Sequence, residues 1–551
     1  MFSFSLLVFL LFKGYFLLLD WELFQFNGQF FTYSVILDWI RLRFLVVVFL
    51  ISSCVIFYRE EYILGETLKN SFAFVVFLFV ISMIFLIIRP NFLSLILGWD
   101  GLGLVSFLLV IYYSNFKSYR AGIITCLSNR IGDGAILIAM GWILSQGDLN
   151  FIFYKIPREE LFVVAVFVVL AAITKRAQIP FSAWLPAAIA APTPVSALVH
   201  SSTLVTAGVY LLIRFYPAVT FVWAGQLLFF LSSLTMIISS LGALYETDLK
   251  KIIALSTLRQ LGLIIISLAA GFRVLAFFHL LTHALFKACL FLCAGRVIHL
   301  YGGRQDIRDL RVVGRYMPWT RIRMAVCSFA LGGVPFLSAF YSKDKIIEES
   351  FRHGLGFVFL LFLILSIFLT IIYRIRLVKF IVGEDYSLNM ARVRDSYAMI
   401  WPISVLTLGA IFGGSFIRWF LLDLRYDNLF FSVKASLLLM LSLGLISGLL
   451  INLPSLGFAG FYSSLIWFLV ALSTKFPLFF GLNFRGQIWK WWDAGWREKL
   501  GPKGVSLELF SAGGIRDTSF HWTYKYYLFT ALSLTLLWGW CILCPYSLCK
   551  A

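Results

Sequence analysis

Long apolar runs, separated by short polar segments, repeat along nearly the whole chain. A bilayer core of about 30 Å is crossed by a helix of about 20 mostly apolar residues, and many of these runs reach that length. The pattern therefore predicts an all-α polytopic membrane protein with about 15 or 16 transmembrane helices. The predicted spans are 4–20, 34–57, 71–89, 91–113, 121–145, 160–175, 184–215, 220–242, 250–270, 274–300, 322–347, 355–378, 397–422, 430–452, 457–474 and 525–545.

Two of these spans contain helix breakers near their middles. The first holds Pro192 and Pro194, and the second holds Gly332, Gly333 and Pro335. A proline kink alone is common in membrane helices. Interrupted hydrophobic segments at corresponding positions of two halves, however, are typical of transporters built from inverted repeats, and they mark the binding site. The repeated interruption therefore indicates transport.

The two ends of the chain differ from this pattern. The first apolar run lacks the basic start and the small-residue cleavage site of a signal peptide, which predicts a retained membrane helix. Between 484 and 524, charged residues alternate with several tryptophans. Such a segment is expected to lie along an interface or a partner rather than across the bilayer. Gly501 and Pro502 predict that it forms several helical pieces, followed by a final apolar anchor.

Composition excludes a water-soluble protein. The chain is 61% hydrophobic and 13% charged, whereas soluble domains are about 45–50% apolar and about 25% charged. The net charge of +19 does not indicate a nucleic-acid partner, because basic residues gather in short loops of membrane proteins and set their orientation. Cys541 and Cys544 form a C-x-x-C pair inside an apolar run without a βαβ pattern, so we expect no redox motif, zinc site or disulfide.

Ionisable side chains inside the apolar runs are the candidate functional residues. Each Asp, Lys or Arg in mid-membrane costs about 2.5–3.5 kcal/mol, and the usual reason for its presence is a proton or ion path. Asp100 has no cation near it in the sequence, which favours function. Arg130 and Asp133 are spaced i, i+3 and can form a structural salt bridge. Lys175 ends an apolar run, where a snorkelling lysine is the alternative interpretation.

A second group of candidates contains histidines. His200 follows the proline-containing segment, where unwound backbone can hold water or a proton. His279, His283 and Lys287 are spaced by four residues, so on a helix they form one slowly rotating stripe rising about 12 Å. Because imidazole titrates near pH 6.5, the stripe has the composition of a proton relay. The alternative is three satisfied groups that bridge neighbouring helices.

Lys343 and Asp344 follow the second interruption. As adjacent residues they do not share a helix face, so we expect them to have different partners. Lys250 and Lys251 look like the ordinary basic flank of a loop. The chain has no dinucleotide fingerprint, P-loop, iron–sulfur cysteine run or metalloprotease helix. Its energy source is therefore expected in partner proteins, with no cofactor or metal in this chain.

The motifs around these residues resemble the subunit 5 family of respiratory complex I, the NADH:ubiquinone oxidoreductase, over essentially the whole chain. They are WDGLG at 99–103, NRIGD at 129–133, APTPVSALVH at 191–200, LSTL at 255–258, HLLTHALFKA at 279–288 and FYSKD at 340–344. The resemblance implies two inverted five-helix repeats, each with one broken helix. It divides the chain into accessory helices (1–70), a first half-channel repeat (71–215), a second half-channel repeat (216–378), further accessory helices (379–483), a lateral amphipathic segment (484–524) and an anchor helix (525–551).

The same resemblance implies the roles of the buried residues. Asp100 and Lys175 form the modulating ion pair of one half, Lys287 is the central relay and Lys343 faces the exit. His200, His279 and His283 link them. Protons then cross the mitochondrial inner membrane, coupled to NADH oxidation and ubiquinone reduction in other subunits that hold NADH, FMN, iron–sulfur clusters and ubiquinone. The expected partners are the other membrane subunits, above all an adjacent antiporter-like subunit reached through the lateral segment, together with membrane lipids.

Three departures from the family pattern change details. Asp100 stands where glutamate is more common, and the short N-terminus implies one accessory helix fewer. Arg176 and Arg259 stand where the family usually has serine, although two buried guanidinium groups are costly. We hypothesise that AGR codons, which several invertebrate mitochondria read as serine, were translated as arginine.

Two other function classes fit part of this pattern. A stand-alone cation/proton antiporter subunit of the Mrp type shares this core, but the lateral segment and the extra anchor favour complex I. A structural scaffold without transport does not explain the charges in mid-membrane.

Overall fold

A computed structural model describes residues 16–26, 29–66, 68–145, 158–219, 221–310, 317–352, 356–382, 396–421, 431–450, 460, 467, 476–517 and 528–536. The chain divides into two compact units, Met1–Thr474 and Lys475–Ala551, which are described separately.

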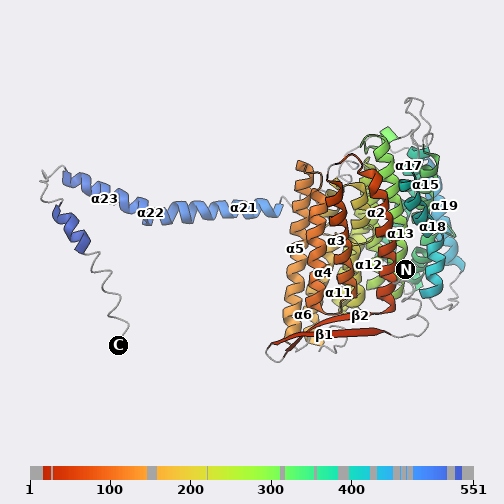
Figure 1. Ribbon diagram of the computed structural model, residues 1–551, viewed down its shortest axis with the longest axis horizontal. Helices are drawn as coiled ribbons and strands as arrows, with labels where there is room; N and C mark the ends of the chain where they lie inside the picture. The colour runs from red at the N-terminus through yellow and green to blue at the C-terminus, as the bar shows by residue number, and fades with distance from the viewer. Residues whose placement is uncertain are drawn as a thin grey trace. The chain divides into compact units, whose positions relative to one another are not determined.

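The first unit is a bundle of helices that run side by side (Figure 1). Ten of the described helices are long and apolar enough to cross a membrane. This confirms the predicted helical membrane protein, although several of the predicted spans fall partly or wholly outside the described residues. The longer helices are α2 (Trp39–Tyr62), α3 (Lys69–Ile88), α4 (Phe92–Ile111), α5 (Phe116–Leu144), α6 (Arg158–Lys175), α11 (Val222–Tyr245), α12 (Leu249–Ala269), α13 (Arg273–Leu300), α15 (Pro318–Gly332), α17 (Phe357–Val382), α18 (Tyr397–Leu421) and α19 (Phe431–Leu450).

An antiparallel hairpin near the N-terminus corrects the all-α prediction. Strand β1 (Leu17–Phe26) pairs with β2 (Gln29–Leu37), with Phe26 opposite Gln29. Residues 17–20 of the predicted span 4–20 therefore lie in a strand, and the remainder up to residue 15 lies outside the described residues. Asn-Gly flanked by aromatic and β-branched residues is a strong signal for a two-residue hairpin turn, and this signal was missed.

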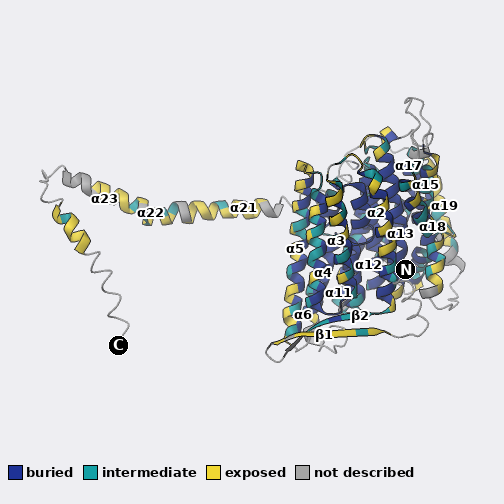
Figure 2. Ribbon diagram, viewed as in Figure 1, coloured by how far each residue is buried: buried dark blue, intermediate teal, exposed yellow. Residues whose placement is uncertain are grey.

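Burial distinguishes the centre of the bundle from its periphery (Figure 2). In α4, Leu97, Leu104 and Leu108 are exposed, as expected of a face turned toward lipid, whereas Trp99 and Leu102 are buried. The helices α12 and α13 are buried along almost their whole length. Protein therefore surrounds His279, His283 and Lys287 of α13 on every side, away from the lipid.

The first interrupted segment consists of α7 (Trp184–Ala187), the 3-10 turn η1 (Ala188–Ala190), α8 (Thr193–Val199) and α9 (Leu204–Arg214). Pro192 and Pro194 lie at the start of α8, where proline is tolerated because the first helical N–H groups have no intrahelical partner. The chain is extended at Ala191 and Pro192, just before α8, and a second break follows at 200–203, so the interruption lies at the prolines and also beyond them.

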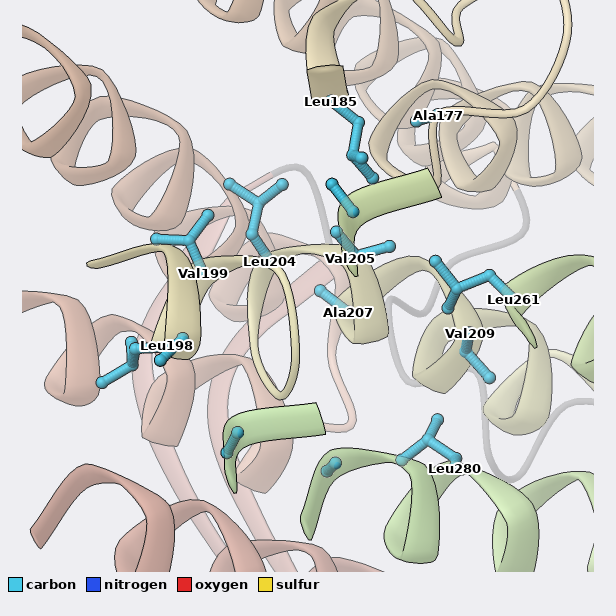
Figure 3. Packing of buried hydrophobic residues seen from close by; sticks show 14 of the residues in the cluster. Ala177, Leu185, Leu198, Val199, Leu204, Val205, Ala207, Val209, Leu261 and Leu280 are labelled. Carbon is cyan, nitrogen blue, oxygen red and sulfur yellow. The ribbon is translucent and has the colours of Figure 1, made fainter. Parts of the chain in front are cut away.

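Apolar side chains fix the two halves of this broken helix. Leu198 and Val199 of α8 and Leu204 and Val205 of α9 are all buried and lie in the packed core (Figure 3). The break is thus enclosed by the core, and its free backbone groups must find partners within the protein.

The second interrupted segment breaks where the glycines stand. Helix α15 ends at Gly332, and Gly333 caps it with φ +86°, a left-handed conformation that suits glycine. The chain then forms the π-helical turn η3 (Phe340–Asp344) and continues into α16 (Lys345–Arg352). A π-helical turn is rare and is frequently found at functional sites. Pro335 lies between α15 and η3.

The second unit contains α21 (Phe476–Ile488), the π-helical η6 (Trp489–Arg497), α22 (Glu498–Leu500) and α23 (Pro502–Asp517). The helix is interrupted at Gly501, which confirms helical pieces at this point. Trp489, Trp491, Trp492 and Trp496 are exposed within the unit. Of the predicted anchor 525–545, the described part is a helix at 528–536.

Candidate functional site

Lys175, the last residue of α6, is fully buried. Its Nζ donates a hydrogen bond of 2.6 Å to the Trp99 carbonyl oxygen and lies 3.7 Å from the centroid of the Trp99 ring. A cation over an indole face is stabilised by the ring quadrupole. Among the described residues Lys175 forms no ion pair, so the lysine is held by backbone and aromatic contacts.

Arg130 of α5 lies between two acidic side chains, Asp100 and Asp133. Its Nη1 lies 3.8 Å from Asp100 Oδ2 and 3.5 Å from Asp133 Oδ2. The predicted i, i+3 pair of Arg130 and Asp133 is confirmed, whereas the expected Asp100–Lys175 ion pair is not formed. Both carboxylates nevertheless lie close enough to attract Lys175 electrostatically, with Asp133 exerting the larger effect.

Asp133 is the more buried of these two acids. Its side chain is 9% exposed, against 31% for Asp100. The Oδ1 atoms of both carboxylates are buried without a hydrogen-bond partner among the described residues. Each carboxylate therefore has one buried oxygen without a described hydrogen-bond donor, and such an oxygen can take up a proton.

His200 lies at the break between α8 and α9, and it is buried with neither ring nitrogen hydrogen-bonded in the described part of the chain. Its ring centroid is 6.4 Å from both Trp184 and Phe291. Lys250, near the start of α12, is also buried, and its Nζ donates to the Ala191 carbonyl oxygen at 3.2 Å. The ordinary loop flank expected for Lys250 is therefore wrong, because its side chain points inward to the broken helix.

Lys251 behaves as the expected basic flank. Its Nζ lies 2.7 Å from Asp248 Oδ2 and 3.9 Å from Glu246 Oε2, and its side chain is 42% exposed.

The stripe on α13 lies wholly inside the protein. His279, His283 and Lys287 are fully buried, and the rings of the two histidines are 6.3 Å apart. Lys287 Nζ donates to Ser256 Oγ at 2.5 Å and to the Ile253 carbonyl oxygen at 3.3 Å. His283 has no hydrogen-bond partner for either ring nitrogen among the described residues. Along this helix face, His279 and Lys287 form hydrogen bonds, and His283 between them has no described partner.

His279 connects this stripe to the second broken helix. Its Nδ1 is 2.9 Å from Ser342 Oγ in η3, and its Nε2 is 3.3 Å from Gln260 Oε1 in α12. An amide oxygen faces Nε2 and a hydroxyl group faces Nδ1, an arrangement that suits the tautomer with its proton on Nε2. Gln260 and Ser342 therefore set the tautomer of His279.

Lys343 and Asp344 meet at the end of α15. Lys343 Nζ donates to the Gly332 carbonyl oxygen at 2.9 Å, at the negative end of the helix dipole. A Cβ on Gly333 would lie 3.5 Å from Lys343 Nζ and 3.2 Å from Asp344 Oδ1. Both side chains thus approach Gly333, and the bond of Lys343 to the Gly332 carbonyl oxygen is not shared by Asp344 among the contacts of the described residues.

Four polar residues of the site were missed in the sequence: Lys250, Ser256, Gln260 and Ser342. Lysine in the first turn of a helix opposes the helix dipole, and this signal could have identified Lys250. Gln260 and Ser256 share a face of α12 at i, i+4, but uncharged residues of this kind are common in helices and gave no signal. Among the described residues, no group of three or more His, Cys, Asp or Glu side chains is arranged to hold a metal ion.

Arg176 and Arg259 are fully buried, and none of their guanidinium nitrogens has a hydrogen-bond partner among the described residues. We predict that the protein isolated from its native membrane carries serine at both positions, because a serine hydroxyl group bonds to its own helix. Chymotryptic peptides that cover 175–180 and 255–260 decide this by mass. An arginine mass at either position contradicts the hypothesis there.

Comparisons with known proteins agree along the chain. A sequence profile described as NADH:quinone oxidoreductase/Mrp antiporter, TM matches residues 90–370. A second, described as NADH dehydrogenase subunit 5 C-terminus, matches residues 373–542.

Relatives match over most of their length. NADH-ubiquinone oxidoreductase chain 5 of Locusta migratoria is 46% identical over 504 residues, which cover 88% of this chain and 87% of the relative. The same chain of Lumbricus terrestris is 38% identical over 535 residues, covering 95% of this chain and 93% of the relative.

Two solved structures share the fold. The Mrp complex from Dietzia sp. DQ12-45-1b has a TM-score of 0.67 and 23% identity, covering 98% of this chain and 59% of that chain. The membrane-bound sulfane sulfur reductase, an archaeal respiratory membrane complex, has a TM-score of 0.64 and 19% identity, covering 76% of this chain and 85% of that chain.

Proposed function

The chain belongs to the NADH-ubiquinone oxidoreductase chain 5 family, and we propose that its buried ionisable residues form the path by which protons cross it. It is a multi-pass subunit of the mitochondrial inner membrane and part of the H⁺-translocating NADH:ubiquinone oxidoreductase, complex I. The redox centres (NADH, FMN, iron–sulfur clusters and ubiquinone) are proposed to be in partner subunits.

The observation that carries the proposal is the buried line from α13 to the broken helix. Lys287, His283 and His279 follow one another on α13, His279 is 2.9 Å from Ser342, and Lys343 is the next residue in the chain. Imidazole and amine groups each exist in two forms that differ by one proton, so neighbouring groups can pass a proton along the line. Bridging waters would complete the steps at His283, whose nitrogens have no described protein partner.

In the first half, the proposed groups are Asp100 and Asp133 with Lys175, followed by His200 and Lys250. Arg130 bridges the two acids. Protonation of either acid weakens the attraction on Lys175, which lets a charge change from a neighbouring subunit alter the protonation of this lysine. Asp133 thereby takes a place in the path beside Asp100.

The second unit is proposed to lie along the adjacent antiporter-like subunit. Its four exposed tryptophans and its neighbouring basic residues suit a segment that rests on a membrane interface and on a partner.

A native gel of detergent-solubilised inner membranes, stained for NADH dehydrogenase activity and probed for this chain, tests the assignment. We expect co-migration with a very large active band. Migration only in a small inactive band would support the other candidate, a stand-alone antiporter, since the Mrp complex has the same fold. In that case Na⁺/H⁺ exchange is the next assay.

For the first half we predict that Asp100→Asn lowers proton pumping several-fold, whereas Asp100→Glu keeps it, because only the first removes the charge. Asp133→Asn is expected to be at least as harmful, since Asp133 is the more buried acid and has the larger electrostatic effect on Lys175. Protons pumped per NADH oxidised in reconstituted vesicles measure this. A normal ratio for Asp133→Asn contradicts its place in the path.

A further inference from the structure

Asn129 of α5 is a buried amide beside the acids of the first half. It is 2% exposed, and neither its Oδ1 nor its Nδ2 has a hydrogen-bond partner among the described residues. A buried amide without partners is unfavourable unless it binds something from outside the chain. We propose that Asn129 positions water between Asp133 and His200, so that protons pass from the acids to the broken helix. The inference rests on the proposed proton path and adds a residue to this step.

Asn129 lies on the same face of α5 as Asp133. The two residues are spaced i, i+4 within one helix, which places their Cβ atoms about 6 Å apart. The Oδ1 of Asp133 is buried and, like the amide, has no donor in the described part of the chain. One water molecule spans a separation of this size and forms a hydrogen bond to each side chain.

The groups around this point suit water rather than a cation. Trp99 Nε1 is buried and close enough to Asp133 to act on its carboxylate, although no acceptor among the described residues completes its hydrogen bond. The indole N–H donates, the carboxylate accepts, and the Asn129 amide does both. A buried water makes about three hydrogen bonds to groups that are otherwise unsatisfied, and this set provides them. The indole N–H and the nearby Lys175 would repel a cation.

Helix α5 also leads from the acids toward the first broken helix. Gly132 of α5 packs against Thr174, the residue before the end of α6. Because α5 and α6 are consecutive helices packed side by side, Asn129 lies just beyond the end of α6, at the level where α5 contacts α7 and η1. The backbone of Ala188 in η1 acts on His200, whose ring nitrogens have no described partner. Asn129 thus lies between Asp133 and the segment that adjoins His200.

Two variants of Asn129 test its role in the intact complex. Asn129→Val fills the site with methyl groups that exclude water, so the protons pumped per NADH oxidised should fall by about tenfold, because a proton transfer loses its positioned partner. Asn129→Ser keeps a hydroxyl group and leaves room for a further water, so it should retain most of the pumping. A purely structural residue predicts the opposite order, since serine leaves the larger cavity. Equal pumping by the two variants, or better pumping by Asn129→Val, overturns the proposal.

Thr125 provides the matched control. It is buried one turn away on the same face of α5, and its hydroxyl group bonds to the Gly122 carbonyl oxygen at 2.8 Å. Thr125→Val should therefore pump normally, and a loss as large as that of Asn129→Val would overturn the proposal. Lys287→Met separates the inference from the proposed path. Loss of pumping in Lys287→Met with normal pumping in Asn129→Val overturns only the role of Asn129, whereas normal pumping in both overturns the path as well.

Discussion

Replacing Lys287 with methionine is expected to abolish proton pumping while the complex still assembles. The lysine is fully buried and donates to Ser256 Oγ and to the Ile253 carbonyl oxygen. In the variant the Ile253 carbonyl oxygen keeps a donor, because Ser256 Oγ donates to it at 2.7 Å. Methionine fills a similar volume without charge, so packing is kept while the protonatable group is lost. We expect the protons pumped per NADH oxidised to fall by at least about tenfold.

Two further variants separate this effect from a loss of structure. Lys287→Arg keeps the charge, but a guanidinium does not release its proton under physiological conditions, so pumping should fail there too. Lys251→Met, one helix away, removes a partly exposed lysine that is paired with Asp248, and it should pump normally. Full coupled pumping by Lys287→Met, measured with a pH-sensitive dye in vesicles, contradicts the relay role of Lys287.

The second large effect concerns the packing of α3 against α4. A Cβ on Gly98 would lie 2.4 Å from the Leu86 backbone nitrogen, 2.8 Å from Leu86 Cα and 2.9 Å from the Ser82 carbonyl oxygen. These are backbone atoms, so the strain of Gly98→Ala can be relieved only by moving one helix away from the other. Close approach through small residues is a main source of helix association in membranes. We expect a destabilisation at the upper end of about 1–3 kcal/mol.

Gly103, on the same helix, provides the control. A Cβ there meets nothing within 4 Å in this chain, and alanine is about 1 kcal/mol more favourable than glycine inside a helix. Gly103→Ala should therefore leave the complex as stable as before or slightly more so. The measurement is the amount of intact complex on a native gel after stepwise heating. Equal heat resistance of the two variants would argue against the close contact of α3 and α4.

The separation of α3 and α4 also matters for the site, because Gly98 precedes Trp99 and Asp100. The Trp99 carbonyl oxygen holds Lys175 at 2.6 Å, so a displaced α4 would release this lysine. Gly98→Ala is therefore expected to lower pumping in the complexes that survive, which links the packing of two outer helices to the chemistry of the first half.

Much of the candidate site could be predicted because mid-membrane charge is costly and therefore visible in the sequence. Asp100, Lys175, Lys287 and Lys343 stood out for this reason alone. Their partners did not, because a partner is chosen by which helices lie side by side. Asp100 finds Arg130 of α5 rather than Lys175, and Lys343, in a π-helical turn, reaches back to the Gly332 carbonyl oxygen at the end of α15.

The N-terminal hairpin shows the same limit at the level of secondary structure. The predicted span 4–20 ran into its first strand at residues 17–20, and the predicted span 34–57 began within its second strand. A window that averages hydropathy cannot distinguish a helix from two short strands, and the Asn-Gly pair was the local signal that could have done so.

The sequence by itself determined that this is a helical membrane protein with two interrupted segments and a buried set of acids, lysines and histidines, because apolar run length and the cost of charge in lipid are properties of the local chain. Only the tertiary structure decided which of these groups meet. It turned Lys250 inward to Ala191, placed Gln260 and Ser342 on either side of His279, and brought Arg214 of α9 to Asp38. These contacts join residues far apart in the chain, and only helix packing brings such residues together.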